Sequence, residues 1–428
     1  MTHPTVVTVE TQRSWRPVLQ GAALDRAWEA IRAIAEELRD PPPSDNASLA
    51  FGHAGLAVMY DYLPPELCSF DSRQVSERYL ELAIHGVANQ PMPASFFPGF
   101  SGVAWAVEHL RARSSGGASE DASSEIDEAL RDLVKRSPWT GPYELTSGLV
   151  GIGVYALEHL PRPIAVECLR GVVDRLAELS ERYPQGVAWR TLPRFLTLAT
   201  PQQCPNGYVD LGLAHGVPGV ISILAAAARS GIASEMSRQM VHAASGWLWA
   251  QALGPEEASA VPQMASSELP RRASRAAWCY GDPGVAASLV AAADAVADGD
   301  LRQQAIELAR RAAARPLEQC GVVDAPLCHG AAGLGHIFNR LLQSTGRVEF
   351  ADAAREWFSR ALEMRHPGQG IGGYQAAERK AGGGLDWVSD PSLLTGAAGI
   401  ALALLAAATS VEPAWDRMLL LSLRSVRS

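Results

Sequence analysis

The chain has 428 residues, of which 47% are hydrophobic and 19% are charged. This balance supports a packed core and excludes a disordered protein. The formal net charge is −9 at pH 7 and no block of lysine and arginine occurs, which argues against nucleic acid or an anionic membrane surface as a partner.

The first residues, MTHPTVVTVETQRSW, contain no basic start followed by an apolar run, so no secretory signal is expected. The longest apolar stretch, residues 396–411, is too short and too rich in alanine for a membrane span, and no integral membrane segment is expected. Six cysteines are too sparse for a disulfide framework. A reducing cytoplasm is therefore expected, where a cysteine–histidine cluster more often binds metal than forms disulfides.

An amphipathic helix is predicted in each of seven units along the chain. These segments carry charges on one face and apolar residues at i, i+3, i+4 and i+7 on the other. Such a helix cannot bury its apolar face alone, so each unit must stack on its neighbours. In chain order the predicted ranges are 24–40, 76–87, 123–137, 165–183, 237–253, 301–315 and 350–365.

A short motif, G-x-x-G, follows each of these helices and precedes an almost uncharged helical segment. Apolar residues lie on all sides of the second segment, as expected for a helix that is buried on every face. The glycines let the turn adopt unusual dihedral angles and let helices approach closely. The copies begin at Gly52, Gly99, Gly148, Gly216, Gly281, Gly330 and Gly396.

Seven outer helices that alternate with seven inner helices predict an all-α fold, an α/α toroid built as a double ring. We expect an N-terminal tail over residues 1–23 and a single toroid domain over residues 24–428. The connection 184–214 is long and contains tryptophan and prolines. Flexible segments are expected at 1–20, 41–47, 113–124 and 254–272.

Three of the seven turns carry candidate metal-binding or catalytic residues. Cys279 precedes the fifth motif, Cys328 and His329 precede the sixth, and His215 precedes the fourth. In a closed toroid the turns before the inner helices converge at one end, so Cys279 and Cys328 are expected to face each other. Two thiolates and one imidazole favour zinc over magnesium or calcium. Three protein ligands leave the fourth position open, as in catalytic zinc sites.

The segments WCYG (278–281), LCHG (327–330) and GLAHG (212–216), together with the repeated G-x-x-G helices, resemble the lanthionine synthetase C family. Members of this family, the LanC-type cyclases, make thioether rings in lanthipeptides. The resemblance covers essentially the whole chain. It implies the double α-toroid and one zinc ion per chain, with the two cysteines and the histidine of the candidate cluster as its ligands.

The resemblance also implies a set of catalytic residues. His215 matches a histidine that takes part in acid/base chemistry, and Arg275 and Tyr280 match an arginine and a tyrosine on either side of the first zinc cysteine. Glu144 stands where the family usually has aspartate, and its side chain is one methylene longer. Asp210 likewise stands where an asparagine is expected.

The implied activity is zinc-dependent cyclisation of a dehydrated precursor peptide. A cysteine thiol of the peptide adds to dehydroalanine or dehydrobutyrine and forms a lanthionine or methyllanthionine ring. Zinc lowers the thiol pKa from about 8.5, Arg275 and Tyr280 donate to the developing enolate, and His215 accepts or returns a proton. No segment resembles a dehydratase, so a separate dehydratase is implied, in the cytoplasm or in a membrane-associated biosynthetic complex.

Three other functions are compatible with these residues. The same chemistry could add glutathione or another thiol to dehydroamino acids in proteins. An α/α-toroid glycoside hydrolase needs two carboxylates, for which Asp210, Asp282 and Glu144 are candidates, but it leaves the cysteines unexplained. A non-catalytic scaffold could bind a peptide in the mouth of the toroid and use zinc as a structural staple.

Some candidates also have a purely structural interpretation. His215 alone could be a helix-capping or packed histidine. Arg271 or Arg272 could take the place of Arg275, which lies in the same basic segment. His336, on the helix after the sixth motif, is expected to be a core histidine.

Overall fold

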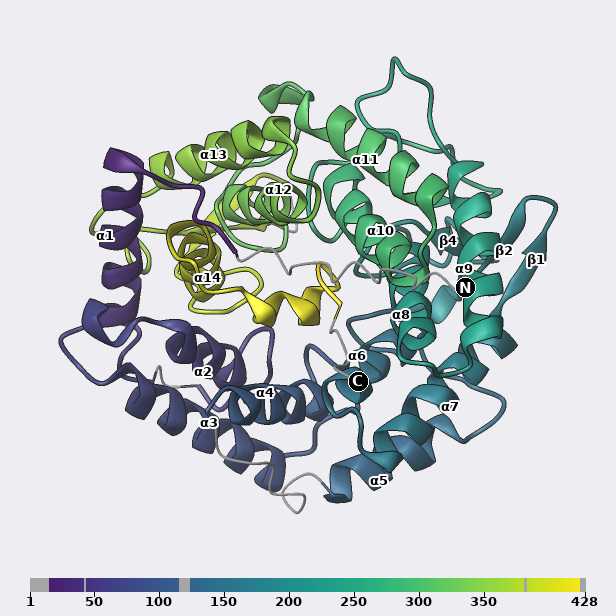
Figure 1. The fold of residues 1–428 in the computed structure, drawn as a ribbon, viewed down its shortest axis with the longest axis horizontal. Helices are drawn as coiled ribbons and strands as arrows, with labels where there is room; N and C mark the ends of the chain where they lie inside the picture. The colour runs from purple at the N-terminus through teal and green to yellow at the C-terminus, as the bar shows by residue number, and fades with distance from the viewer. Residues whose placement is uncertain (1–14, 42–43, 115–123, 381–382, 424–428) are drawn as a thin grey trace, which may run out of the picture.

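The structure, a computed structural model, describes residues 15–41, 44–114, 124–380 and 383–423. Within these ranges fourteen α-helices alternate between an outer and an inner layer around a common centre (Figure 1), and the strands are short. This arrangement confirms the predicted α/α toroid. Residues 1–14 of the predicted tail lie outside the described residues, as do parts of two connections expected to be flexible, 42–43 and 115–123.

The outer helices are amphipathic, as predicted. In the last of them, for example, Phe350, Trp357 and Phe358 are buried, whereas Glu349 and Arg360 lie on the charged face. The bounds are α1 Gly21–Glu37, α3 Ser72–Asn89, α5 Ser124–Val134, α7 Pro163–Leu179, α9 Ser234–Trp249, α11 Gly299–Ala313 and α13 Val348–Glu363.

The inner helices are buried on almost every side. In the seventh inner helix every residue from Ala397 to Ala407 is buried, which explains why the sequence there carries no charge. The bounds are α2 His53–Tyr62, α4 Phe100–Arg113, α6 Leu149–Glu158, α8 Val217–Arg229, α10 Asp282–Val296, α12 Ala331–Thr345 and α14 Ala397–Ala408.

The inner layer closes on itself because α14 packs against α2. Each other inner helix packs against the next one along the chain, and α1 packs on α14, so the first outer helix covers the last inner one (Figure 1). Repeat units that stack in this way bury their apolar faces without leaving an exposed end.

Backbone hydrogen bonds join all seven turns ahead of the inner helices into a closed belt. Each bond runs from an N–H group of one turn to a carbonyl of the next, with N···O distances from 2.9 to 3.3 Å. Every accepting residue lies two positions before the first glycine of its motif, so the seven turns share one register. The accepting residues, in chain order, are Ala50, Phe97, Thr146, Ala214, Cys279, Cys328 and Leu394.

The fifth turn shows why the motif requires glycine. Gly281 has a φ of +97°, and a Cβ there would lie 2.0 Å from the carbonyl oxygen of Arg275. At Gly284 a Cβ would lie 2.2 Å from the carbonyl oxygen of Trp278. Only glycine fits this tight loop, and the loop holds Cys279 at the rim of the toroid.

The strands lie in the connections between helices and form three small antiparallel sheets. β1 (Glu181–Tyr183) pairs with β2 (Gly186–Ala188), and β6 (Ala376–Arg379) pairs with β7 (Leu385–Val388). The third sheet has the order β3-β4-β5, with Arg190 opposite Val209 and Val209 opposite Ala265. Its strands are β3 Arg190–Thr191, β4 Tyr208–Asp210 and β5 Met264–Ala265.

The segment 254–272, expected to be flexible, takes part in this packing. It supplies β5, and its Val261 is 2% exposed. The backbone N–H groups of Ala260 and Val261 each donate to the carboxylate of Asp282, at 2.8 Å. The expectation was wrong because a two-residue strand leaves no periodic pattern in the sequence.

Both ends of the described chain pack against the helices. The short 3₁₀ helix η4 (Ala414–Leu419) lies in the middle of the toroid, shown in yellow in Figure 1. Near the start, the backbone N–H of Val18 donates to the carbonyl of Ala407 at 2.8 Å, and Trp15 is buried. Three further 3₁₀ helices are η1 Pro65–Leu67, η2 Pro193–Phe195 and η3 Leu317–Gln319.

Among the described residues, no helix combines the length and the apolar character that crossing a membrane requires.

Candidate metal centre and active site

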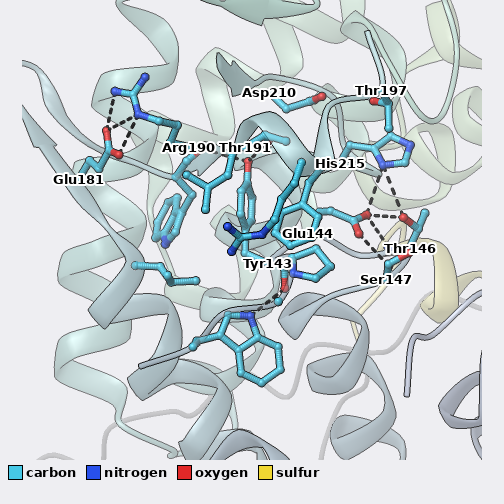
Figure 2. A pocket seen from close by; sticks show the side chains of 18 residues that line it. Tyr143, Glu144, Thr146, Ser147, Glu181, Arg190, Thr191, Thr197, Asp210 and His215 are labelled. Atoms are coloured by element: carbon cyan, nitrogen blue, oxygen red, sulfur yellow. Dashed lines mark hydrogen bonds and ion pairs between the residues drawn. The ribbon is translucent and has the colours of Figure 1, made fainter. Parts of the chain in front are cut away.

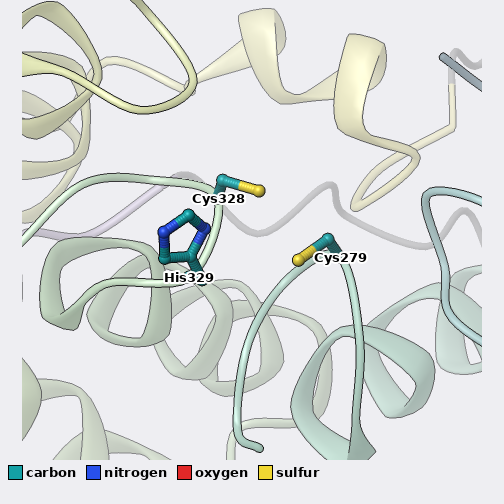
Figure 3. A group of neighbouring side chains, drawn as sticks. All are labelled: Cys279, Cys328 and His329. Atoms are coloured by element: carbon teal, nitrogen blue, oxygen red, sulfur yellow. The ribbon is translucent and has the colours of Figure 1, made fainter. Parts of the chain in front are cut away.

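The turns before α10 and α12 bring Cys279, Cys328 and His329 together. One ligand atom from each residue lies within 4.8 Å of the other two. Figure 3 shows the two sulfur atoms and the imidazole ring turned toward a common space. The shared register explains the meeting, because the two cysteines are consecutive members of the belt and the N–H of Cys279 donates to the carbonyl of Cys328 at 3.3 Å.

The chemistry of this cluster fits a zinc ion. His329 Nδ1 is buried and has no hydrogen-bond partner among the described residues, which is costly unless another ligand satisfies it. Two sulfur donors and one imidazole nitrogen are the donor set that zinc prefers. Cys279, Cys328 and His329 could therefore hold the ion, and three protein ligands match the number in catalytic rather than structural sites.

The electrostatics of the cluster favour a thiolate at Cys279. A hydrogen bond from the Cys328 thiol lowers the pKa of Cys279, against the opposing effect of burial. The positive charge of Arg275 lowers the same pKa. Arg275 therefore acts electrostatically on the cysteines. Its neighbour Arg271 instead donates to the carbonyl of Gln251 at 3.0 Å.

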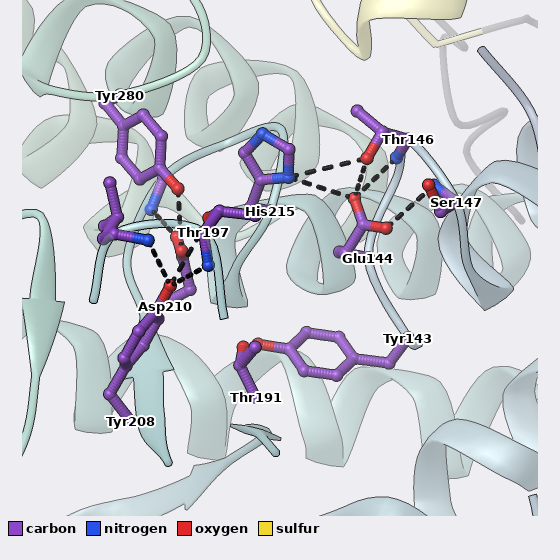
Figure 4. A network of polar contacts seen from close by, with 12 residues as sticks. Tyr143, Glu144, Thr146, Ser147, Thr191, Thr197, Tyr208, Asp210, His215 and Tyr280 are labelled. Carbon is purple, nitrogen blue, oxygen red and sulfur yellow. Dashed lines mark hydrogen bonds and ion pairs between the residues drawn. The ribbon is translucent and has the colours of Figure 1, made fainter. Parts of the chain in front are cut away.

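His215 lies on the neighbouring turn, paired with Glu144. Its Nδ1 is 3.2 Å from Glu144 Oε2. The Glu144 carboxylate also accepts hydrogen bonds from the backbone N–H groups of Thr146, at 2.7 Å, and Ser147, at 2.8 Å, and from the Thr146 hydroxyl. These contacts fix the longer side chain of glutamate against the imidazole (Figure 4).

The surroundings of His215 favour its protonated form. Burial lowers the pKa of the imidazole, but the hydrogen bond and negative charge of Glu144, together with the charge of Asp210, outweigh burial and raise the pKa to about 9. The side chain is 26% exposed. At neutral pH His215 is therefore an imidazolium with access to solvent, suited to donate a proton.

Tyr280 connects the histidine turn to the cysteine turn. Its hydroxyl donates to Asp210 Oδ2 at 2.8 Å, and its aromatic ring stacks on His215 with centroids 5.7 Å apart (Figure 4). Asp210 Oδ1 accepts from the N–H of Gly212 at 2.8 Å, and burial raises the pKa of Asp210 to about 6. Tyr280 thus holds Asp210 and packs against His215.

The sequence-predicted residues therefore fall into two linked groups. Cys279, Cys328 and His329 form the metal cluster, on which the charge of Arg275 acts. Glu144, His215, Asp210 and Tyr280 form the acid/base cluster. A backbone bond joins the two, from the N–H of Ala214 to the carbonyl of Cys279 at 3.3 Å.

Thr146 was not among the residues predicted from the sequence. Its hydroxyl contacts Glu144 and lies 3.5 Å from His215 Nδ1. The signal that could have found it is the register of the motif, because Thr146 occupies in the third turn the position that Cys279 and Cys328 occupy in theirs.

Two other candidates have structural roles. Asp282 is engaged with the loop at Ala260 and Val261, so it is not placed as one of a pair of catalytic carboxylates. His336 is fully buried and pairs with Asp416 at 2.9 Å, which confirms the expectation of a core histidine.

A cavity of about 250 Å³ opens beside the acid/base cluster. His215, Glu144 and Asp210 line it, together with residues of the connection between α7 and α8 and of the turn at Trp139 (Figure 2). This cavity was not predicted from the sequence.

Comparisons with known proteins agree with this architecture. The model of the family described as lanthionine synthetase C-like protein matches residues 43–420. The nisin biosynthesis protein NisC of Lactococcus lactis subsp. lactis is 24% identical over 323 residues, which cover 69% of this chain and 75% of that protein.

A solved structure of a nisin cyclase superposes with a TM-score of 0.70 at 20% identity, covering 94% of this chain and 98% of that one. At this level of identity the likeness establishes a shared fold, the α/α toroid.

Proposed function

This chain belongs to the lanthionine synthetase C-like family, and from that membership we propose that it is a zinc-dependent lanthipeptide cyclase. The observation that carries the proposal is the side-by-side placement of two clusters. A set of zinc-type donors, Cys279, Cys328 and His329, lies one belt position away from an imidazolium, His215. The first cluster suits activation of a thiol, and the second suits delivery of a proton.

The proposed reaction is an intramolecular addition within a dehydrated precursor peptide. A cysteine sulfur forms a bond to the β-carbon of dehydroalanine or dehydrobutyrine. The π electrons of the carbon–carbon double bond move toward the neighbouring carbonyl as an enolate, and the α-carbon then takes up a proton. The thiol proton is released, so the ring is an isomer of the linear peptide.

A zinc ion held by Cys279, Cys328 and His329 would supply the positive charge that makes a substrate thiol ionise at neutral pH. His215 donates the proton to the α-carbon, because its pKa near 9 keeps it charged. Glu144 orients the imidazole through Nδ1, and the guanidinium of Arg275 balances the negative charge that develops on the enolate oxygen.

Tyr280 acts in this proposal by positioning. Its hydroxyl is committed to Asp210, so it holds the wall on which the imidazole stacks rather than donating to the enolate. The proposed substrate is a peptide whose serine or threonine residues a separate dehydratase has already dehydrated. All six cysteines are free thiols, which suits the reducing cytoplasm as the compartment.

The proposed function is tested by measuring whether the cysteine thiol of a substrate peptide is consumed. A synthetic peptide that contains one dehydroalanine and one cysteine, three residues apart, is incubated with the zinc-loaded protein and then treated with N-ethylmaleimide. Cyclised peptide does not react, so mass spectrometry reads the product directly. We expect His215→Asn to retain its zinc but to lose about 10²–10⁴-fold in rate.

Two results would decide against the proposal. If the peptide stays fully alkylatable with the parent protein, the chain is not a cyclase for such substrates. If the peptide gains the mass of glutathione when that thiol is present, in preference to closing, the activity is intermolecular thiol addition. Full activity of the His215→Asn variant would remove the histidine from the mechanism.

A further inference from the structure

The long connection between α7 and α8 builds the outer wall of the cavity beside His215. Glu144 and His215 line the cavity, and so do Trp139, Leu192 and Phe195. The proposed reaction uses the first two residues. It gives no role to the three apolar side chains.

This wall is fixed to the catalytic turn. β3 pairs with β4, which ends in Asp210, the residue held by Tyr280. The indole nitrogen of Trp189 donates to the carbonyl of Leu176 at 2.8 Å, and the Tyr143 hydroxyl donates to the carbonyl of Trp189 at 3.0 Å. A cavity whose wall is braced in this way is already formed before a ligand arrives.

A second brace holds the loop that follows η2. The Tyr208 hydroxyl accepts hydrogen bonds from the backbone N–H groups of Thr197 and Leu198, each at 3.1 Å. Tyr208 is itself fully buried in β4. The position of Phe195, two residues before Thr197, is therefore tied to the same sheet as Asp210.

Several polar side chains around the cavity already have partners. Glu181 pairs with Arg190 at 2.8 Å, and Glu144 pairs with His215. The indole nitrogen of Trp139 donates to the carbonyl of Pro142 at 3.0 Å, and Arg194 donates to the carbonyl of Thr140 at 2.9 Å. Most of the surface that the cavity walls leave for a ligand is apolar.

Two of the apolar side chains remain accessible. Leu192 is 38% exposed, and Phe195 is partly exposed beneath the guanidinium of Arg194, 4.7 Å from its aromatic ring. A volume of about 250 Å³ admits one large side chain and not a folded segment. An apolar side chain that enters would gain the free energy of burial without displacing an existing ion pair.

We propose that this cavity is a specificity pocket for the apolar side chain of the substrate residue next to the dehydroamino acid. The inference rests on the proposed function, since His215 must reach the α-carbon of the dehydroamino acid. The adjacent residue of an extended peptide is then only one residue length, about 3.3–3.6 Å, further along. The substrate class is thus a peptide with leucine, isoleucine or an aromatic residue beside its acceptor site.

Binding of unreactive peptides to the zinc-loaded full chain tests this pocket apart from the chemistry. The probes are acetylated hexapeptides with alanine in place of dehydroalanine and serine in place of cysteine. One member of each pair carries leucine next to the alanine, and the other carries asparagine at the same position. Pairs with the test residue before the alanine and pairs with it after the alanine are each titrated by calorimetry. Burial of the leucine side chain predicts that its peptide binds about tenfold tighter or more.

Variants of the cavity wall test whether the preference for the leucine peptide arises in this cavity. Trp139→Ala and Phe195→Ala should each reduce it severalfold, whereas Trp387→Ala, which removes a 48% exposed tryptophan on β7, should leave it unchanged. Equal affinity for the two peptides in the parent protein would overturn the proposal, and so would a preference that survives in both pocket variants. A parent that binds with the preference but never closes a dehydrated peptide contradicts the proposed function and not the pocket.

Discussion

Glu144 joins the turn that precedes α6 to the proposed proton donor, His215. Its carboxylate reaches His215 Nδ1, and it also accepts from the N–H groups of Thr146 and Ser147. The local backbone thus presents the carboxylate to the imidazole.

Glu144→Gln should shift the pH dependence of cyclisation. In the parent, the proton donor is present below a pKa of about 9, so activity should fall as pH rises through 9. Replacing the carboxylate removes the largest contribution that raises the pKa of His215, and burial then lowers it. The alkaline limb should move to lower pH, measured as initial rate of thiol loss at constant zinc.

Glu307→Gln is the control for this shift, because Glu307 lies on the exposed face of α11 and pairs only with Arg310 among the described residues. The raised pKa of His215 also makes the folding stability depend on pH. The contribution of the His215–Glu144 pair is fully present below pH 6.5 and is lost as pH rises through 9. An alkaline limb that does not move in Glu144→Gln would contradict the role given to Glu144.

At the scale of elements, the turn before α10 is the most constrained segment of the site. Gly281→Ala places a Cβ on a backbone with φ of +97° and 2.0 Å from a carbonyl oxygen. We expect a loss of about 1–3 kcal/mol in the free energy of unfolding and a lower zinc content, because the same turn carries Cys279. Chemical denaturation and metal analysis measure the two effects.

Gly299→Ala is the matched control, since a Cβ at Gly299, at the start of α11, meets nothing within 4 Å. That variant should be as stable as the parent or slightly more stable. If Gly281→Ala behaves like Gly299→Ala, the account of the turn is wrong.

The helices could be predicted from sequence because their periodicity is strong, but their ends could not. The predicted outer helix 76–87 is α3, which begins at Ser72 because Asp71 caps it by accepting from the N–H groups of Arg73 and Gln74. An aspartate just before a helix is a visible signal that the apolar pattern alone does not use.

The part of the candidate site that could be predicted is the part set by equivalent positions in successive G-x-x-G turns. Cys279 and Cys328 occupy equivalent positions in adjacent repeats, so closure of the toroid was enough to bring them together. The direction of the Tyr280 hydroxyl toward Asp210, and the cavity at Trp139, depend on β3, β4 and β5. These strands have two or three residues and leave no signal that sequence reasoning could use.

At the scale of the whole molecule, η4 fills the centre of the toroid with a buried ionic network. Asp416 is fully buried, and its carboxylate contacts Arg340 at 2.8 Å and His336 at 2.9 Å. Arg340 is itself 7% exposed. Because α12 carries both Arg340 and His336, this network ties the end of the described chain to the inner layer.

Asp416→Ala should destabilise the fold strongly. It leaves the charge of Arg340 buried without its main counter-ion, which costs about 3–5 kcal/mol. Glu412→Ala is the comparison, because Glu412 pairs with the same arginine from a side chain that is 55% exposed, where such a pair contributes about 0–1 kcal/mol. Urea titration of both variants measures the difference, and equal stability would contradict the assigned network.

One zinc ion is proposed to bind at Cys279, Cys328 and His329. Metal analysis of the purified protein beside Cys279→Ala, Cys328→Ala and Cys320→Ala tests this site, with circular dichroism to follow helicity. We predict one zinc per chain in the parent and in Cys320→Ala, whose cysteine lies outside the cluster, and none in the other two at unchanged helicity. Zinc retained at the parent level in both cluster variants, or a parent that takes up none from excess zinc, would contradict the account.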